Sequence, residues 1–208
     1  MILRKGYMNR LVIRAFDLIS SSVGMVFLSP VFVFTAIALK TDSKGPVFYL
    51  QNRVGRNGLD FKLYKFRTMR TDADKFGFLT VGSDDPRITR VGAFLRKYKL
   101  DELPQLWNVL KGEMSLVGPR PEVRRYTDLY SPDQKKLIFS VRPGITDYAS
   151  IEYSNENNLL STVPDPEQYY VNELLPAKIR LNLVFIENPS FGNYLKIIFR
   201  TIAKIFAH

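Results

Sequence analysis

Two adjacent carboxylates, Asp101 and Glu102, are the residues of this chain best suited to chemistry. They come directly before Leu103-Pro104 and a helical pattern, so we expect them at a helix N-terminus, where free N–H groups and the dipole stabilise negative charge. Asp101 should then stay ionised near neutral pH, as a carboxylate nucleophile must, and Glu102 offers oxygen ligands to Mg²⁺. Acidic residues are also ordinary N-terminal caps of helices, and the pair taken alone favours that simpler interpretation.

Basic side chains from several Gly- and Pro-containing segments could surround this pair. Guanidinium groups on rigid proline-containing turns suit bidentate contacts with phosphate oxygens, although any one of them taken singly reads as a solvated surface residue. Several arginines around two carboxylates are the residue types that metal-dependent phosphoryl transfer from a diphosphate requires. This interpretation assumes that the segments meet in space. The candidates are Lys65, Arg67, Arg87, Arg90, Arg96, Arg120 and Arg142.

Composition argues against several other kinds of catalytic site. Cysteine is absent, which excludes a disulfide framework, a thiolate nucleophile and a zinc–cysteine site. The single histidine is the final residue, His208, so a Ser-His-Asp triad or a histidine-ligated metal is not expected. The formal net charge of +10 points to an anionic partner: nucleic acid, a phosphorylated metabolite or a membrane surface.

The basic charge lies beside the two most apolar stretches of the chain. Residues 1–70 carry twelve basic and three acidic side chains, and residues 178–208 are also basic, whereas residues 147–177 contain six acidic side chains and no basic ones. Neither an RNA-binding signature nor a helix-turn-helix pattern is apparent. The placement therefore favours membrane lipid and a phosphorylated ligand over nucleic acid.

The first apolar stretch, Leu18 to Leu39, has twenty-two residues without a charge, which is long enough to span a bilayer. Ser29-Pro30 lies in its middle, where proline kinks a helix. Basic residues flank both ends, whereas a single crossing should show a bias toward one side. We therefore expect a re-entrant helical hairpin that returns to the same face. A conventional span, a cleaved signal peptide and a buried helix of a soluble core are the alternatives.

The second apolar stretch, residues 194–206, has the pattern of an amphipathic helix. Lys196, Arg200 and Lys204 form one basic stripe, and an apolar face accompanies it, made by Leu195, Ile198, Ile202 and Ile205 with Phe199 and Phe206 beside them. A basic amphipathic helix lying in the membrane interface has this pattern. A terminal helix docked on the protein core has it too.

Between these stretches the sequence predicts a β-hairpin and several helices. Residues 46–51 and 61–66 read as strands around the turn Arg56-Asn57-Gly58, and residues 91–98 read as a helix. A second helix has a predicted buried face of Leu103, Leu106, Trp107 and Leu110, and Gly112 can end it. Residues 155–158 and 163–166 suggest loops. The expected fold is α+β and mainly helical, with a membrane anchor at 1–44 and a catalytic domain at 45–208.

Three strings carry a resemblance to a known family. They are GPVFYLQNRVGRNGLDFKLYKFRTM (45–69), DPRITRVGAFLRKYKLDELPQLWNVLKGEMSLVGPRPE (85–122) and RPGIT (142–146). With the Ser-Pro break and the basic C-terminal stretch, nearly the whole chain resembles the bacterial sugar transferases, the monotopic phosphoglycosyl transferases. The likeness is to the small form of the family, without the additional N-terminal membrane helices of larger members.

The resemblance implies an activity at the cytoplasmic face of the bacterial inner membrane. Members of this family transfer a sugar-1-phosphate from a nucleotide diphosphate sugar, usually a UDP-sugar, to a polyprenyl phosphate such as undecaprenyl phosphate, and release UMP. This step begins assembly of a capsule, O-antigen, exopolysaccharide or glycoprotein glycan. Which sugar is carried, which glycan is built and whether a homodimer forms stay open.

The resemblance also implies roles for individual residues. Asp101 is the expected nucleophile, which forms a covalent phospho-sugar intermediate, and Glu102 is the expected Mg²⁺ ligand. Arg96 and Arg120 are expected to contact phosphate or nucleotide, with Lys65 nearby. Ser29 and Pro30 match the break of the re-entrant helix. We extend phosphate binding to Arg67 and Arg142 on charge and position alone.

Some features depart from the family or fit other interpretations. Asp147 follows RPGIT where many members have glycine, and the acidic region 147–177 matches weakly, so it shapes a sugar pocket or is a variable solvated loop. A second mechanism keeps the enzyme but lets polyprenyl phosphate attack directly, with Asp101 only holding metal. The alternative to an enzyme is a non-catalytic, basic membrane-surface or nucleic-acid-binding protein.

Overall fold

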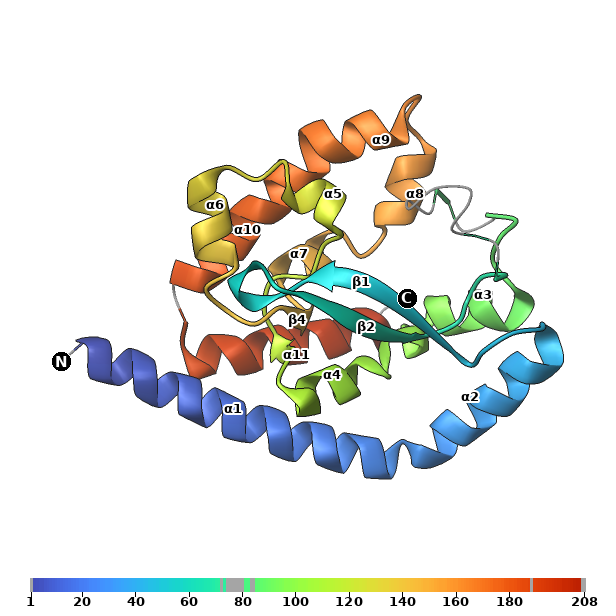
Figure 1. The fold of residues 1–208 in the computed structure, drawn as a ribbon, viewed down its shortest axis with the longest axis horizontal. Coiled ribbons are helices and arrows are strands. Elements are labelled where there is room, and N and C mark those ends of the chain that lie inside the picture. The colour runs from blue at the N-terminus through green and yellow to red at the C-terminus, as the bar shows by residue number, and fades with distance from the viewer. Residues whose placement is uncertain (1, 72, 74–80, 83–84, 188, 207–208) are drawn as a thin grey trace.

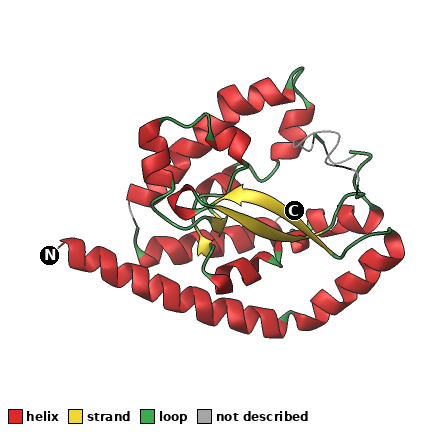
Figure 2. Ribbon diagram, viewed as in Figure 1, coloured by secondary structure: helices red, strands yellow, loops and turns green. Residues whose placement is uncertain are grey.

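The computed structural model describes residues 2–71, 73, 81–82, 85–187 and 189–206. His208, for which the sequence predicts no catalytic or metal-binding role, lies outside these residues. Helices make up most of the described chain, and the strands form two small two-stranded sheets (Figure 2). The expected α+β, mainly helical class is confirmed.

The N-terminal apolar stretch forms two helices that run along one side of the molecule, α1 (Ile2–Phe27) and α2 (Ser29–Asp42) (Figure 1). Pro30 has no N–H to donate to the Val26 carbonyl four residues earlier, and the Ser29 hydroxyl donates to that carbonyl instead, at 2.8 Å. No single described helix has the length and apolar character to cross a bilayer. The segments Arg10–Phe27 and Ser29–Asp42 meet that requirement only together, bent by 58°. The break at Ser29-Pro30 is thus confirmed, while its place in a membrane stays a prediction.

The predicted hairpin is confirmed. Strands β1 (Phe48–Val54) and β2 (Asp60–Phe66) pair antiparallel around a short 3₁₀ turn (Arg56–Gly58). Asn57 and Gly58 both have positive φ in this turn, 60° and 73°, which explains the residue types found there.

Both predicted central helices form, as α3 (Arg90–Lys97) and α4 (Gln105–Lys111), and Gly112 ends α4 with a φ of 85°. The buried face predicted for α4 is wrong at Trp107, which is 47% exposed, whereas Leu103, Leu106 and Leu110 are half-buried. The fully buried residues are Gln105, Asn108 and Val109. The reason is that Asn108 joins α4 to β2: its side chain accepts from the Tyr64 N–H at 3.0 Å and donates to the Lys62 carbonyl at 2.7 Å.

The acidic part of the chain is more helical than predicted. The expected loop at 155–158 is wrong, because α8 (Glu156–Ser161) begins inside it and buries Leu160. Between α4 and the C-terminal helix, the other elements are, in chain order, β3 (Ser115–Val117), α5 (Arg124–Thr127), α6 (Pro132–Ile138), β4 (Gly144–Thr146), α7 (Tyr148–Glu152), α9 (Pro166–Tyr169), a π-helical turn (Tyr170–Leu174) and α10 (Leu175–Glu187). Strands β3 and β4 pair in parallel.

The C-terminal helix α11 (Phe191–Phe206) both docks on the core and leaves apolar side chains exposed. Tyr194 and Ile197 are buried in a cluster with Val117 of β3 and Phe185 of α10. Phe199 and Ile202 are exposed. One face of α11 therefore packs on the protein core, as the second interpretation of its sequence predicts. The opposite face leaves apolar and basic side chains exposed, and these could contact another surface.

Candidate active site around Asp101 and Glu102

Asp101 and Glu102 lie on a 3₁₀ turn, Leu100–Glu102, between α3 and α4. Lys99 precedes this turn in the left-handed conformation, with a φ of 56°, and so turns the chain out of α3. Helix α4 itself begins at Gln105 with Pro104 as its N-cap. The sequence predicted the pair at the N-terminus of this helix, whereas the pair lies on the turn before the observed start of α4. Asp101 is buried, at 7% exposure.

Glu102 brings together basic side chains from two distant segments. The Arg120 guanidinium, from the turn after β3, donates to both carboxylate oxygens, with Nη1 at 3.2 Å from Oε2 and Nη2 on Oε1. Lys65 Nζ, from β2, lies 3.1 Å from Oε1. A bidentate guanidinium contact fixes direction as well as charge. Lys65 and Arg120 therefore meet the acidic pair as predicted, each by contact with Glu102.

Arg96 stands on α3, beside the pair. Its Nε donates to the Thr68 hydroxyl at 2.9 Å. Burial lowers the pKa of Arg96 and raises that of Asp101, and the attraction between these two charges opposes both shifts. Helix α3 presents Arg96 in this way because Gly92 lets the helix approach the backbone at Thr68: a Cβ at Gly92 would lie 2.1 Å from the Thr68 carbonyl oxygen.

The two carboxylates differ in their pKa values. Burial, and after it the charge of Glu102, raises the pKa of Asp101 above its usual value, so the stabilisation expected from a helix N-terminus is not what governs this group. Burial alone would also raise the pKa of Glu102, but Arg120 and Lys65 outweigh it and hold that pKa well below its usual value. Glu102 is the carboxylate that the surrounding cations keep ionised.

Arg67 and Arg142 make different contacts. The Arg67 guanidinium donates to backbone carbonyls at the end of α2, those of Leu39 at 3.2 Å and Ser43 at 2.8 Å. Arg142 donates to the Gly112 carbonyl at 2.8 Å, at the end of α4 opposite to the acidic pair. Positive groups stabilise helix C-termini, so both contacts have a structural explanation. Phosphate binding by these two residues stays a prediction.

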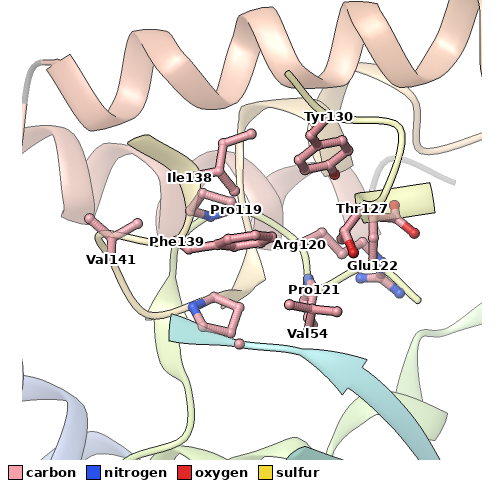
Figure 3. Close-up of a pocket in the computed structure, with 12 residues that line it drawn as sticks. Val54, Pro119, Arg120, Pro121, Glu122, Thr127, Tyr130, Ile138, Phe139 and Val141 are labelled. Atoms are coloured by element: carbon pink, nitrogen blue, oxygen red, sulfur yellow. The ribbon is translucent and has the colours of Figure 1, made fainter. Parts of the chain in front are cut away.

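A small pocket lies beside the turn that carries Arg120 (Figure 3). On its polar side, Glu122 accepts from the Tyr170 hydroxyl at 2.8 Å and pairs with Arg53 at 3.3 Å. Sequence reasoning singled out the Pro-Arg-Pro segment but missed Glu122 and Arg53, whose partners are set only by packing. The lining residues are Val54, Gly55, Pro119, Arg120, Pro121, Glu122, Thr127, Tyr130, Ile138, Phe139, Val141 and Pro143.

The carboxylates of the site suit a metal that is shared with a substrate. Among the described residues, no three Asp, Glu, His or Cys side chains lie close enough to hold a metal ion by themselves. Mg²⁺ commonly takes one or two protein carboxylates and completes its shell with substrate phosphates and water. Asp101 and Glu102 offer two such carboxylates, but Arg120 and Lys65 already bind both oxygens of Glu102, so Mg²⁺ binding here stays a prediction.

The chain is similar to known proteins over nearly its whole length. The sequence profile of the family described as bacterial sugar transferase matches residues 8–208. The chain is 36% identical, over 92% of its length, to the UDP-N-acetylgalactosamine-undecaprenyl-phosphate N-acetylgalactosaminephosphotransferase of Aeromonas hydrophila, and covers 43% of that protein. It is 36% identical, over 96% of its length, to the UDP-glucose:undecaprenyl-phosphate glucose-1-phosphate transferase of Escherichia coli, and covers 41% of it.

A third relative is similar in length as well as in sequence. It is the exopolysaccharide production protein PSS of Rhizobium leguminosarum, to which the chain is 38% identical over 95% of its own length and 96% of the relative. The chain thus spans less than half of the first two relatives and nearly all of the third. The match to the family profile and these identities lead to one conclusion: the chain belongs to the bacterial sugar transferase family.

Proposed function

We propose that this protein transfers a sugar-1-phosphate from a UDP-sugar to a polyprenyl phosphate and releases UMP, as a membrane step of polysaccharide or glycoconjugate assembly. The observation that carries the proposal is the pair of buried Asp101 and half-buried Glu102, with Arg120 and Lys65 in contact with Glu102 and Arg96 beside the pair. The names of two relatives, which refer to transfer onto undecaprenyl phosphate, support the choice of acceptor.

The proposed reaction consists of two displacements at one phosphorus atom. In the first, a carboxylate oxygen of Asp101 bonds to the phosphorus that carries the sugar, and the bond to the bridging oxygen breaks, so that UMP leaves with the electron pair. In the second, an oxygen of polyprenyl phosphate attacks that phosphorus and the bond to Asp101 breaks, which restores the carboxylate. A covalent intermediate shared by two substrates predicts ping-pong kinetics.

The basic residues reduce the electrostatic repulsion between the two anionic reactants. A carboxylate that approaches a diphosphate is repelled by it, and Arg96, Arg120 and Lys65 offset that repulsion. Glu102 holds the Arg120 guanidinium and the Lys65 ammonium in place before substrate arrives. Glu102 would hold Mg²⁺, which would further neutralise the charge on the phosphoryl oxygens.

A lipid-linked acceptor requires an active site close to the membrane surface. We place α1 and α2 in the bilayer as a re-entrant hairpin, supported by their joint length and apolar character and by the 58° bend. The exposed Phe199 and Ile202 of α11, with Lys196 and Arg200 beside them, suit the interface with anionic lipid. The catalytic part then faces the cytoplasm at the inner membrane.

The direct test is UMP release by the purified protein in detergent or vesicles, with a panel of UDP-sugars, Mg²⁺ and polyprenyl phosphate. We expect release with at least one UDP-sugar, dependent on the metal and on the acceptor for continued turnover. Absence of release with every sugar, together with RNA binding that falls steeply with salt, would instead support the non-catalytic, nucleic-acid-binding alternative.

A further inference from the structure

Asp147 is a fully buried carboxylate, at 0% exposure, that the proposed chemistry does not use. Its two oxygens serve two different segments. Oδ2 accepts from the backbone N–H of Arg120 at 3.0 Å, and Oδ1 accepts from the backbone N–H of Ser150 in the first turn of α7. One side chain therefore ties the turn that carries Arg120 to the start of a helix.

The parallel pairing of β3 with β4 brings these segments together. Val117 pairs with Thr146, so the residues that follow both strands leave the sheet at the same edge. The backbones approach so closely that a Cβ at Gly144 would lie 2.0 Å from the Gly118 nitrogen. Arg120 and Asp147, which follow these strands, are thereby placed side by side.

Within the three residues 119–121, only Arg120 has a backbone N–H to donate. Pro119 and Pro121 on either side have fixed φ angles and no N–H. Two hydrogen bonds therefore position the Arg120 backbone relative to the sheet: Asp147 accepts the Arg120 N–H, and the Pro119 carbonyl accepts the Gly144 N–H at 3.0 Å. The guanidinium of the same residue donates to Glu102, which lies on the 3₁₀ turn between α3 and α4.

We propose that Asp147 is a positioning residue: by accepting the Arg120 N–H, it holds the turn from which the Arg120 guanidinium reaches Glu102 and the donor diphosphate. This inference rests on the proposed function. It assigns the start of the acidic region 147–177 a part in binding the donor, through Arg120 and without contact with the substrate.

The substitution Asp147→Ser separates this role from simple helix capping. Serine is a favoured N-cap, so it keeps an acceptor for α7, but its single short oxygen leaves the Arg120 N–H without one. We expect some loss of thermal stability, because the Arg120 N–H loses its acceptor. Below the melting temperature we expect a fall in kcat/KM for the UDP-sugar on the order of 10- to 100-fold, because a displaced catalytic group costs that much. Asp165→Ser is the matched control, since Asp165 caps α9 through the Gln168 N–H at 2.9 Å.

A double-mutant cycle with Arg120→Ala, measured as UDP affinity, tests whether the effect passes through Arg120. We expect Asp147→Ser to weaken UDP binding in the wild-type background and to add nothing in the Arg120→Ala background. Wild-type kcat/KM in Asp147→Ser, an equal loss in Asp165→Ser, or additive losses in the cycle would each overturn the inference. If Asp147→Ser does not fold, Asp147→Asn, which keeps the shape and one oxygen, takes its place. Absence of UMP release by the wild-type protein would contradict the proposed function instead.

Discussion

Glu102 is the residue that organises the candidate site. It binds Arg120 in a bidentate manner and Lys65 by an ion pair, and these partners come from segments far apart in the sequence. Removal of one member of such a partly buried group leaves uncompensated charge, which is costly, so the carboxylate and its cations are expected to act as a unit. The pKa of Asp101 beside it is raised, whereas Arg120 and Lys65 lower the pKa of Glu102, so the cations stabilise the charge of Glu102 more strongly than that of Asp101.

The substitution Glu102→Gln tests this organising role. The amide keeps the shape but loses the charge that holds Arg120 and Lys65 and that would bind Mg²⁺. We expect the Mg²⁺ concentration for half-maximal UMP release to rise about tenfold or more, which is the effect expected from loss of a metal ligand or its support. Magnesium titration of both proteins is the measurement, with Glu187→Gln, at an exposed position of α10, as control. An unchanged magnesium requirement would exclude Glu102 as a ligand.

The residue identities of the site were largely predictable, and their connections were not. The strings around Asp101, Arg96 and Arg120 pointed to these residues through the family resemblance. Thr68, which accepts from Arg96, and Asp147, which accepts from the Arg120 backbone, gave no signal of such contacts. These bonds depend on close approaches of the backbone, which a sequence pattern does not record.

At the scale of elements, patterns with a clear period were predicted well. The hairpin and helices α3 and α4 follow from turn residues and from apolar spacing. Strands β3 and β4 pair over only three residues each, too few for an alternating pattern to be recognised. The buried face of α4 was misjudged because Asn108 is buried by hydrogen bonds to β2, and the pattern of apolar residues cannot show such bonds.

The contact between α3 and the backbone at Thr68 yields a prediction at this scale. A Cβ at Gly92 would collide with the Thr68 carbonyl, so Gly92→Ala must push α3 and Arg96 away. We expect a loss of about 1–3 kcal/mol of stability, as for other overpacked sites. Gly192→Ala is the control, because nothing lies within 4 Å of its Cβ on α11, and it should gain about 0.5–1 kcal/mol. Denaturant unfolding in detergent measures both, and equal stability of the two variants would argue against the close contact.

At the scale of the whole molecule, the two ends of the chain are joined through a buried polar cluster. Asp17 of α1 accepts from the Ser115 hydroxyl at 2.8 Å and from the Leu116 N–H at 3.1 Å, and it binds the Tyr194 hydroxyl of α11. The first helix is thus fixed to β3 and to the last helix. Arg14 of α1 adds a second attachment, because it donates to the Val109 carbonyl of α4 at 2.8 Å. The predicted domain boundary at residue 44 stays a prediction.

The re-entrant topology predicts where labels attach. The natural chain has no cysteine, so Met8→Cys and Lys44→Cys give single-labelled proteins, with Lys136→Cys on α6 as a reference for the catalytic part. We expect a membrane-impermeant thiol reagent to label all three positions from the cytoplasmic side of the membrane. Labelling of positions 8 and 44 from opposite sides would replace the hairpin by a conventional span.

The central claim is that Asp101 forms a covalent bond with the phospho-sugar, and intact-protein mass spectrometry tests it most directly. With a UDP-sugar that supports UMP release and without polyprenyl phosphate, the wild-type protein should gain the mass of one sugar phosphate. It should lose that mass again when the acceptor is added. Asp101→Asn should show neither the added mass nor turnover. Full turnover by Asp101→Asn, or turnover by the wild-type protein without any adduct, would contradict the account and favour direct attack by the acceptor.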